Sequence, residues 1–450
     1  MSLLPLPEIV LIIYAIVAVF LKTRYNKKID CVWGLAAAFF ICLIRREEPD
    51  DFGFFCCGPG GYAFKSLLSA AGIVISRLPT ERDFTRQISL CFLEAGSLTA
   101  ISAGSFLFLF LALEITAAPQ YLFDNRSLRD DEGKIRLALL LRAASLLLFS
   151  AATALIYYSC GSINFNDVRS AVAAARISSF AGPAWALLLM AAAFRMRIRP
   201  PKAARTDGFE IYGPAVFVTA YPAAAFVAYK LIADVFRFPE GSPTERIITA
   251  VGLASVLYGS FGAAFGNDIM KILRRCVVCS FGTILICAAL RSPAGLYGTV
   301  FSLISDMIAA IGIHFAAAEI KTSKFKPITN IEDLKALSCQ FPVLAVAISV
   351  LFLSLTGFPP FPGFRSRFYV CLSLFEKSPS AFFYPISFVF NLICATKILS
   401  VLWFGKNKNA FAPDRNYGGI ICLILLTTIF AIPSADKISN TLQTEFYFAR

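Results

Sequence analysis

One stretch of the sequence decides the fold: Leu353-Ser354-Leu355-Thr356-Gly357-Phe358-Pro359-Pro360-Phe361-Pro362-Gly363-Phe364-Arg365-Ser366-Arg367-Phe368-Tyr369. It lies inside an apolar run over 341–376, which is too long for one straight membrane crossing. Because proline lacks the backbone N–H and clashes with the carbonyl four residues back, Pro359-Pro360 next to Gly357 predicts a broken helix. A break at membrane depth is tolerated only where protein or a watered cavity satisfies the freed backbone groups. A broken helix with charge beside it is typical of an ion path.

The composition is that of a membrane protein. Hydrophobic residues make up 57% of the 450 residues, charged residues 16%, and the mean hydropathy is +0.69. A water-soluble core does not hold so many apolar side chains, so a soluble enzyme is excluded. We assign the formal charge of +13 to loops beside anionic lipid, and expect no nucleic acid partner. Because no Lys or Arg precedes Lys22, we expect neither a signal peptide nor a transit peptide.

Windows of about 20 apolar residues predict an all-α polytopic membrane protein with about 14 transmembrane helices. Lys and Arg concentrate in the odd-numbered connections, as expected for loops on the cytoplasmic or matrix face. No long hydrophilic segment interrupts the spans, so residues 1–450 are predicted to form a single integral membrane domain. The predicted spans lie near 7–21, 31–44, 61–76, 87–103, 105–123, 137–158, 180–199, 213–236, 247–265, 276–290, 294–318, 341–376, 381–404 and 417–433.

Glu114 is the most informative single residue. It lies in the apolar run 106–115 and has no basic neighbour in its own span. A carboxyl there is either protonated or paired across helices, so it is either a packing residue or a proton site. Arg195 closes the apolar run 185–194. It belongs either to a basic loop or to an ion pair with Glu114.

Lys230 and His314 are further ionisable residues inside apolar runs. Asp234 lies four residues after Lys230 on the same helical face. Lys230 is therefore either half of a surface pair or a buried proton carrier, since lysine releases a proton when desolvated, whereas arginine does not. His314 is the single histidine, and it is either a satisfied polar residue or a relay.

Other charges in apolar runs suggest a polar seam through the bundle. We expect Glu94 and Arg142 to lie too deep for snorkelling, and Asp306 and Lys397 to lie nearer the ends of their spans. The cysteines are scattered in apolar runs, where they pack as small hydrophobes. Cys276-x-x-Cys279 lacks a second ligand pair, so no metal site is expected.

Several motifs occur together in a recognisable order. Leu111–Ile115 with Pro119 looks like a fifth-span glutamate motif, and Phe194-Arg195 followed by Pro200 has the spacing of a seventh-span lysine and its proline. With the stretch 353–368, these motifs resemble the antiporter-like membrane subunits of respiratory complex I, which are related to multi-subunit cation/proton antiporters. Matches run from about residue 60 to 405, and within the family the chain looks most like subunit 2 of NADH:ubiquinone oxidoreductase.

The resemblance implies an antiporter-like fold of two inverted five-helix repeats, each with a broken helix. The repeats are expected at 87–236 and 247–404, after an N-terminal three-helix segment at 1–80 and before a last helix and tail at 417–450. Pro200 marks the first break, and Gly357, Pro359 and Pro360 mark the second.

The resemblance also implies a function, a proton-translocating membrane-arm subunit that couples quinone reduction elsewhere in an NADH:ubiquinone reductase to proton transfer. Glu114 and Arg195 would form an electrostatic switch, Lys230 the central carrier, His314 a relay and Arg367 the charge at the exit half-channel. The family usually carries lysine at the positions of Arg195 and Arg367. The alternatives are therefore a structural, non-pumping membrane-arm subunit and a subunit of a multi-subunit cation/proton antiporter.

No redox cofactor is expected on this chain, because the sequence has no ligand set and no nucleotide-binding loop. Flavin and iron–sulfur clusters are expected on other subunits. The expected partners are other membrane-arm subunits of complex I and lipids such as cardiolipin. The expected location is the mitochondrial inner membrane, with the bacterial plasma membrane as the alternative.

Overall fold

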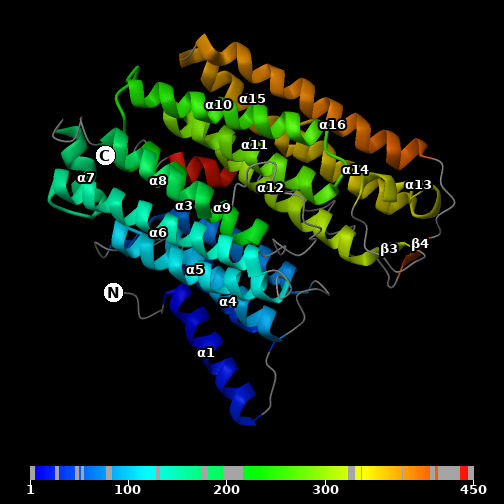
Figure 1. The fold of residues 1–450 in the computed structure, drawn as a ribbon, viewed down its shortest axis with the longest axis horizontal. Coiled ribbons are helices and arrows are strands. Elements are labelled where there is room, and N and C mark those ends of the chain that lie inside the picture. Colours follow the sequence, from blue (N-terminus) through cyan, green and yellow to red (C-terminus); the bar gives the residue numbers. More distant parts are fainter. Residues whose placement is uncertain are drawn as a thin grey trace. The chain divides into compact units, whose positions relative to one another are not determined.

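The described part of the protein is almost entirely helical in the computed structural model (Figure 1). The structure describes residues 6–25, 30–45, 50–51, 55–77, 84–127, 132–174, 181–195, 216–322, 330–335, 337–377, 379–405, 411–413 and 436–443. The chain divides into two compact units. The first unit comprises Met1–Ser76 with Glu81–Phe238, and the second comprises Arg77–Thr80 with Pro239–Arg450.

The first unit packs helices against one another and contains one short strand pair. Its helix α4 packs against α5, α1 and α3, and α6 packs against α8. The last span of the unit is α9 with a π-helical segment at each end, Val216–Ala220 and Leu231–Phe236. The helices are α1 (Pro7–Tyr25), α2 (Val32–Ile44), α3 (Pro59–Ser76), α4 (Phe84–Ile101), α5 (Phe106–Ser127), α6 (Glu132–Cys160), α7 (Phe165–Ala173), α8 (Ala181–Arg195) and α9 (Tyr221–Lys230), and β1 (Asp50–Asp51) pairs antiparallel with β2 (Cys56–Cys57).

The second unit begins its helices at residues that favour a helix start. Ser242 and Asp268 cap α10 and α11, each accepting a hydrogen bond from a backbone N–H three residues later. Proline occupies the first turn of α10, α14 and α16, where its missing N–H costs nothing. The elements are α10 (Pro243–Ala264), α11 (Ile269–Leu290), α12 (Pro293–Glu319), α13 (Leu337–Gln340), α14 (Pro342–Thr356), α15 (Pro362–Lys377), α16 (Tyr384–Phe404), and the antiparallel pair β3 (Ile320–Thr322) and β4 (Phe411–Pro413).

Glycines let α10 and α11 approach closely. A Cβ on Gly252 would lie 2.9 Å from the backbone oxygen of Gly282, and a Cβ on Gly282 would lie 2.6 Å from the backbone oxygen of Gly252. Both distances are too short for a side chain, so the two backbones touch here. Small residues at such contacts are the usual means of helix association in membranes.

Six helical segments in the described part of the chain are long and apolar enough to cross a membrane. They are Leu140–Cys160, Val216–Phe236, Pro243–Ala264, Ile269–Leu290, Pro293–Ala316 and Ala381–Phe404. Val32–Ile44, Phe106–Ala117 and Pro342–Thr356 are shorter apolar helices. The all-helical membrane fold is therefore confirmed, while the count of fourteen spans and the inverted repeats stay predictions. The predicted span 417–433 lies outside the described residues.

The helix break falls inside the stretch 353–369, as predicted from its glycine and prolines. Helix α14 ends at Thr356, and α15 begins at Pro362. Gly357 has φ +80°, a left-handed conformation that glycine adopts without steric cost. The N–H of Phe358 donates to the carbonyl of Leu353 at 2.9 Å, which closes the last turn as in a Schellman motif. The break is therefore an ordered helix end.

Candidate functional site

Lys230 is the last residue of α9 and directs its ammonium group to the end of another helix. The Nζ atom donates to the carbonyls of Ala103 at 2.9 Å, Ile101 at 3.3 Å and Cys56 at 3.3 Å. The ring of Phe165 lies 5.8 Å from the same atom. Helix α4 ends at Ile101, so the ammonium lies at the negative end of a helix dipole, where a cation is favoured.

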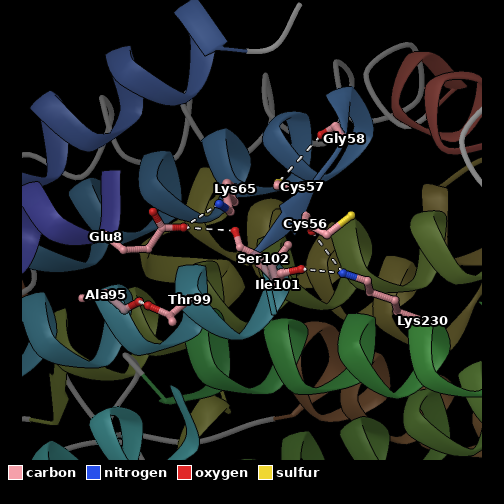
Figure 2. Close-up of polar contacts among 10 residues, drawn as sticks. All are labelled: Glu8, Cys56, Cys57, Gly58, Lys65, Ala95, Thr99, Ile101, Ser102 and Lys230. Carbon is pink, nitrogen blue, oxygen red and sulfur yellow. Dashed lines mark hydrogen bonds and ion pairs between the residues drawn. The ribbon is translucent and has the colours of Figure 1, made fainter. Parts of the chain in front are cut away.

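A buried ion pair lies on the other side of this helix end (Figure 2). Lys65 Nζ, on α3, contacts Glu8 Oε1, on α1, at 2.5 Å, and the two side chains are 0% and 4% exposed. The Ser102 hydroxyl donates to the same carboxylate oxygen at 3.2 Å. The rings of Tyr62 and Phe55 lie 4.7 and 5.1 Å from the ammonium. A charged pair so fully buried in a membrane protein marks a candidate functional site.

The backbone segment 101–103 joins these two groups. Ile101 and Ala103 offer their carbonyls to Lys230. The side chain of Ser102, between them in the chain, contacts Glu8 (Figure 2). Two ammonium groups and one carboxylate therefore surround the point where α4 ends. All three groups are able to exchange a proton, which a guanidinium is not. We call Glu8, Lys65, Ser102 and Lys230 the α4-end cluster.

Glu114, the most informative residue of the sequence, forms an ion pair with Arg142. Their atoms Oε2 and Nη2 are 3.0 Å apart, and the side chains are 29% and 30% exposed. The carboxyl is therefore paired across helices, between α5 and α6. Arg195 is the last residue of α8, but its side chain lies outside the described residues, so its predicted pairing with Glu114 stays a prediction.

The predicted depth of Arg142 in the membrane stays a prediction. Arg142 lies ten residues after the start of α6, and its side chain is 30% exposed. Glu94, also expected to lie deep, is 0% exposed.

The surface pair between Lys230 and Asp234, one of the two alternatives for Lys230, does not form. Asp234 is buried and binds Arg169 of α7 and Arg237, whose Nη2 atom lies 3.2 Å from Oδ1. The helical spacing is correct, but the chain changes to a π-helical segment directly after Lys230, which alters the direction of the side chains that follow. Of the two readings of Lys230, the structure favours the interior one.

Arg367 covers the end of α14 across the helix break. It is 7% exposed, and its Nη2 atom donates to the Leu355 carbonyl at 2.9 Å. The ring of Phe388 lies 6.0 Å from its guanidinium. A Cβ on Gly357 would collide with the Arg367 side chain, so glycine leaves the room that the guanidinium occupies. Of the residues marking the breaks, Pro359 and Pro360 lie between α14 and α15, while Pro200 lies outside the described residues.

Other ionisable groups of the second unit have local partners. The Nδ1 atom of His314 lies 2.7 Å from the carbonyl of Ala310, one turn earlier on α12. Ser280 donates to Asp306 at 3.1 Å. Lys397 donates to the Asn267 side chain at 2.6 Å, after the end of α10. The relay role of His314 stays a prediction, and no group of three His, Cys, Asp or Glu suited to a metal occurs among the described residues.

The sequence reasoning missed Glu8 and Lys65. Lys65 is the single charged residue of the run 59–76, which is otherwise mostly apolar or glycine. A lone charge in an apolar run is the same signal that singled out Glu114. Glu8 lies close to the start of its apolar run, where an end-of-helix position explains a charge equally well. The partnership between residues 57 positions apart follows from the packing of α1, α3 and α4, which no local pattern contains.

Comparison with known proteins places this geometry in a family. The family model for NADH:quinone oxidoreductase/Mrp antiporter, TM, matches residues 103–393. A relative named NADH-quinone oxidoreductase subunit N 1, from Rhizobium meliloti, is 23% identical over 454 residues and covers 95% of this chain and 93% of its own. A relative of the same name from Solibacter usitatus is 26% identical, covering 81% of this chain and 79% of its own.

Two solved structures share the fold. A chain of respiratory complex I from Thermus thermophilus with bound aureothin matches with a TM-score of 0.73 at 17% identity, covering 95% of this chain and 96% of that one. A chain of the Mrp complex from a Dietzia species matches with a TM-score of 0.73 at 14% identity, covering 96% of this chain and 52% of that one. These likenesses show the antiporter-like membrane fold.

Proposed function

The chain belongs to the NADH:quinone oxidoreductase/Mrp antiporter family, and from this premise we propose that it is a proton-translocating membrane-arm subunit of an NADH-quinone oxidoreductase. The named relatives are subunits of that enzyme and are matched over most of their length, which supports this choice. In this role the chain belongs to an H⁺-translocating oxidoreductase, and quinone reduction occurs elsewhere in the complex. Flavin and iron–sulfur clusters are carried by other subunits.

The observation that carries the proposal is the α4-end cluster. Glu8 and Lys65 are buried in the first unit and Lys230 is partly buried, in surroundings where a charge is costly unless a function retains it. Lys230 is the group we assign as central carrier, because an ammonium that donates to neutral carbonyls exchanges its proton when another acceptor comes within reach. We assign the Glu114–Arg142 ion pair, which joins α5 and α6, as the switch, because opening it leaves a carboxylate and a guanidinium without each other's compensating charge.

The test is the substitution Glu114→Gln in the intact complex. NADH oxidation and proton transport are measured on the same membranes, and we expect fewer protons per NADH. Glu240→Gln is the matched control, since Glu240 is an exposed carboxylate that is also paired with a basic side chain, Lys377. An unchanged proton ratio in Glu114→Gln, with normal assembly, means that Glu114 is packing and contradicts the proposal.

A structural, non-pumping subunit is the second candidate function. Arg367 occupies the break between α14 and α15, and a guanidinium does not release its proton under physiological conditions. A fixed charge at that place favours a role in which the second unit supports the assembly. This candidate predicts that Glu114→Gln lowers neither proton transport nor NADH oxidation. A subunit of a multi-subunit cation/proton antiporter is the third candidate, and co-purification of flavin and iron–sulfur subunits excludes it.

Finer assignments are part of the same proposal. We assign the chain to the subunit 2 branch on the strength of its fourteen-span pattern and its Gly161–Asn164 turn, while the relatives bear the name subunit N. The two inverted repeats lie at 87–236 and 247–404. The partners are other membrane-arm subunits and lipids such as cardiolipin. The location is the mitochondrial inner membrane, with the bacterial plasma membrane as the alternative that the bacterial relatives support; fractionation of the source cells decides.

A further inference from the structure

Glu94 is a further buried carboxyl in the first unit, and its surroundings differ from those of Glu8. Its side chain is fully buried on α4, and within the described part of the chain neither carboxyl oxygen has a hydrogen-bond partner. Ser69 faces it from α3, but the two groups do not meet hydrogen-bond geometry. A Cβ on Gly72 would lie 3.4 Å from Oε2, so the carboxyl fills the space beside that glycine.

A carboxylate without a partner is disfavoured in such a place. Moving an isolated ionised carboxyl out of water costs many kcal/mol, so the group takes up a proton instead. An apolar side chain of similar size would fill the space beside Gly72 without that cost. Among the described residues, the thiols of Cys42 and Cys91 lie close enough to interact with Glu94, and neither is a strong acid.

One face of α3 connects Glu94 with the α4-end cluster. Lys65, Ser69 and Gly72 are spaced at i, i+4 and i+7, which places them on the same side of the helix. Lys65 binds Glu8 near one end of this row, and Glu94 lies at Gly72, about 10 Å further along the helix axis. The buried hydroxyl of Ser69 lies between them and has no hydrogen-bond partner in the described segments.

We propose that Glu94 is a proton-binding site that exchanges one proton with the Glu8–Lys65 pair by way of Ser69. This inference rests on the proposed proton-translocating function. In the exchange the Glu94 carboxyl loses a proton and the Glu8 carboxylate gains one. Ser69 and Lys65 each receive one proton and pass one on, so both keep their charge. The net result is that one negative charge moves from Glu8 to Glu94, and the Glu8–Lys65 ion pair opens.

The first test uses a hydrophobic carbodiimide, which modifies protonated carboxyls that lie in apolar surroundings. The intact complex in its membrane is treated with dicyclohexylcarbodiimide, and the peptides are identified by mass spectrometry. We expect the label on Glu94 and not on Glu8, which is held as a carboxylate by Lys65. Glu94→Gln loses the label at that peptide. Recovery of the Glu94 peptide without label overturns the proposal.

The second test measures protons transported per NADH in Glu94→Gln and Ser69→Ala. We expect a loss in both, because each removes one member of the route. Ser66→Ala is the matched control, since the Ser66 hydroxyl donates to the Ala63 carbonyl of its own helix. An unchanged ratio in an assembled Glu94→Gln complex overturns this inference. If Glu114→Gln still lowers the ratio, the proposed function stands; if neither variant lowers it, the proposed function fails as well.

Discussion

Removing either partner of the Glu8–Lys65 ion pair lowers the free energy of unfolding. A double-mutant cycle measures how much of each loss comes from the pair. Lys65→Met removes the ammonium and leaves a buried carboxylate that, among the described residues, keeps a hydrogen bond from the Ser102 hydroxyl at 3.2 Å. Glu8→Gln removes the carboxylate and leaves a buried ammonium between two aromatic rings. Each single change therefore strands one charge, while the double change strands none.

The structure predicts the order in which Lys65→Met, Glu8→Gln and the double variant lose free energy of unfolding. Removing one partner of a buried ion pair costs about 3–5 kcal/mol. The rings of Tyr62 and Phe55 each stabilise the stranded ammonium by about 0.5–2 kcal/mol, so we expect Glu8→Gln near the lower end and Lys65→Met near the upper. Replacing both partners is often nearly neutral, so the double variant loses about 1 kcal/mol and the coupling energy is at least about 5 kcal/mol.

The assay is the free energy of unfolding of the full chain in mixed micelles titrated with sodium dodecyl sulfate. Both single variants and the double variant are compared with the parent chain. Lys377→Met is the control, because its pair with Glu240 is largely exposed and contributes about 0–1 kcal/mol. The reasoning is refuted if each single variant loses less than about 1 kcal/mol of unfolding free energy, or if the double variant loses as much as the two single variants together.

Three further substitutions test other parts of the structure. Gly357→Ala loses about 1–2 kcal/mol of unfolding free energy, because φ is +80° and the new Cβ displaces Arg367; a loss below 0.5 kcal/mol contradicts this. The hydrogen bond from Lys377 lowers the pKa of the exposed Glu240 carboxyl in the folded chain. Their pair therefore stabilises the fold at pH values above the pKa of a glutamate in the unfolded chain, about 4, and this stabilisation is lost as the pH falls through the lowered pKa. In a pH titration of stability, Glu240→Gln is expected to remove a step of at most about 0.5 kcal/mol. Lys230→Arg keeps the contacts with the carbonyls but lowers protons per NADH, whereas equal ratios contradict the carrier role.

Local patterns were sufficient for the helices and for the break. Apolar windows place α10, α12 and α16 close to their observed bounds, since burial in lipid depends on the run of side chains itself, whereas α11 begins seven residues before its predicted span. The break at Gly357 follows from residue chemistry alone, because only glycine adopts φ +80° freely and Pro362 favours a helix start. These features do not depend on which helix lies next to which.

Partners in the candidate site required the packing of the helices. The spacing of Lys230 and Asp234 predicts a pair in a regular α-helix, but a π-helical segment follows Lys230 and separates their directions. Arg142 reaches Glu114 from the next helix, 28 residues along the chain. The Glu8–Lys65 pair joins residues 57 positions apart, and neither residue has a nearby partner of opposite charge that would reveal it. Charges in apolar runs identify candidates, while their partners are set by tertiary structure.

In each unit a basic side chain binds carbonyl oxygen at the end of a helix, but the two side chains differ in whether they release a proton. In the first unit the ammonium of Lys230 binds carbonyls where α4 ends, and in the second the guanidinium of Arg367 binds a carbonyl where α14 ends. Each cation offsets the roughly −0.5 charge that a helix dipole places at that end. An ammonium gives up its proton when its surroundings change, whereas a guanidinium does not. Both units therefore gain the same stabilisation, but proton exchange at the helix end is open only to the first, where Glu8, Lys65 and Glu94 also lie.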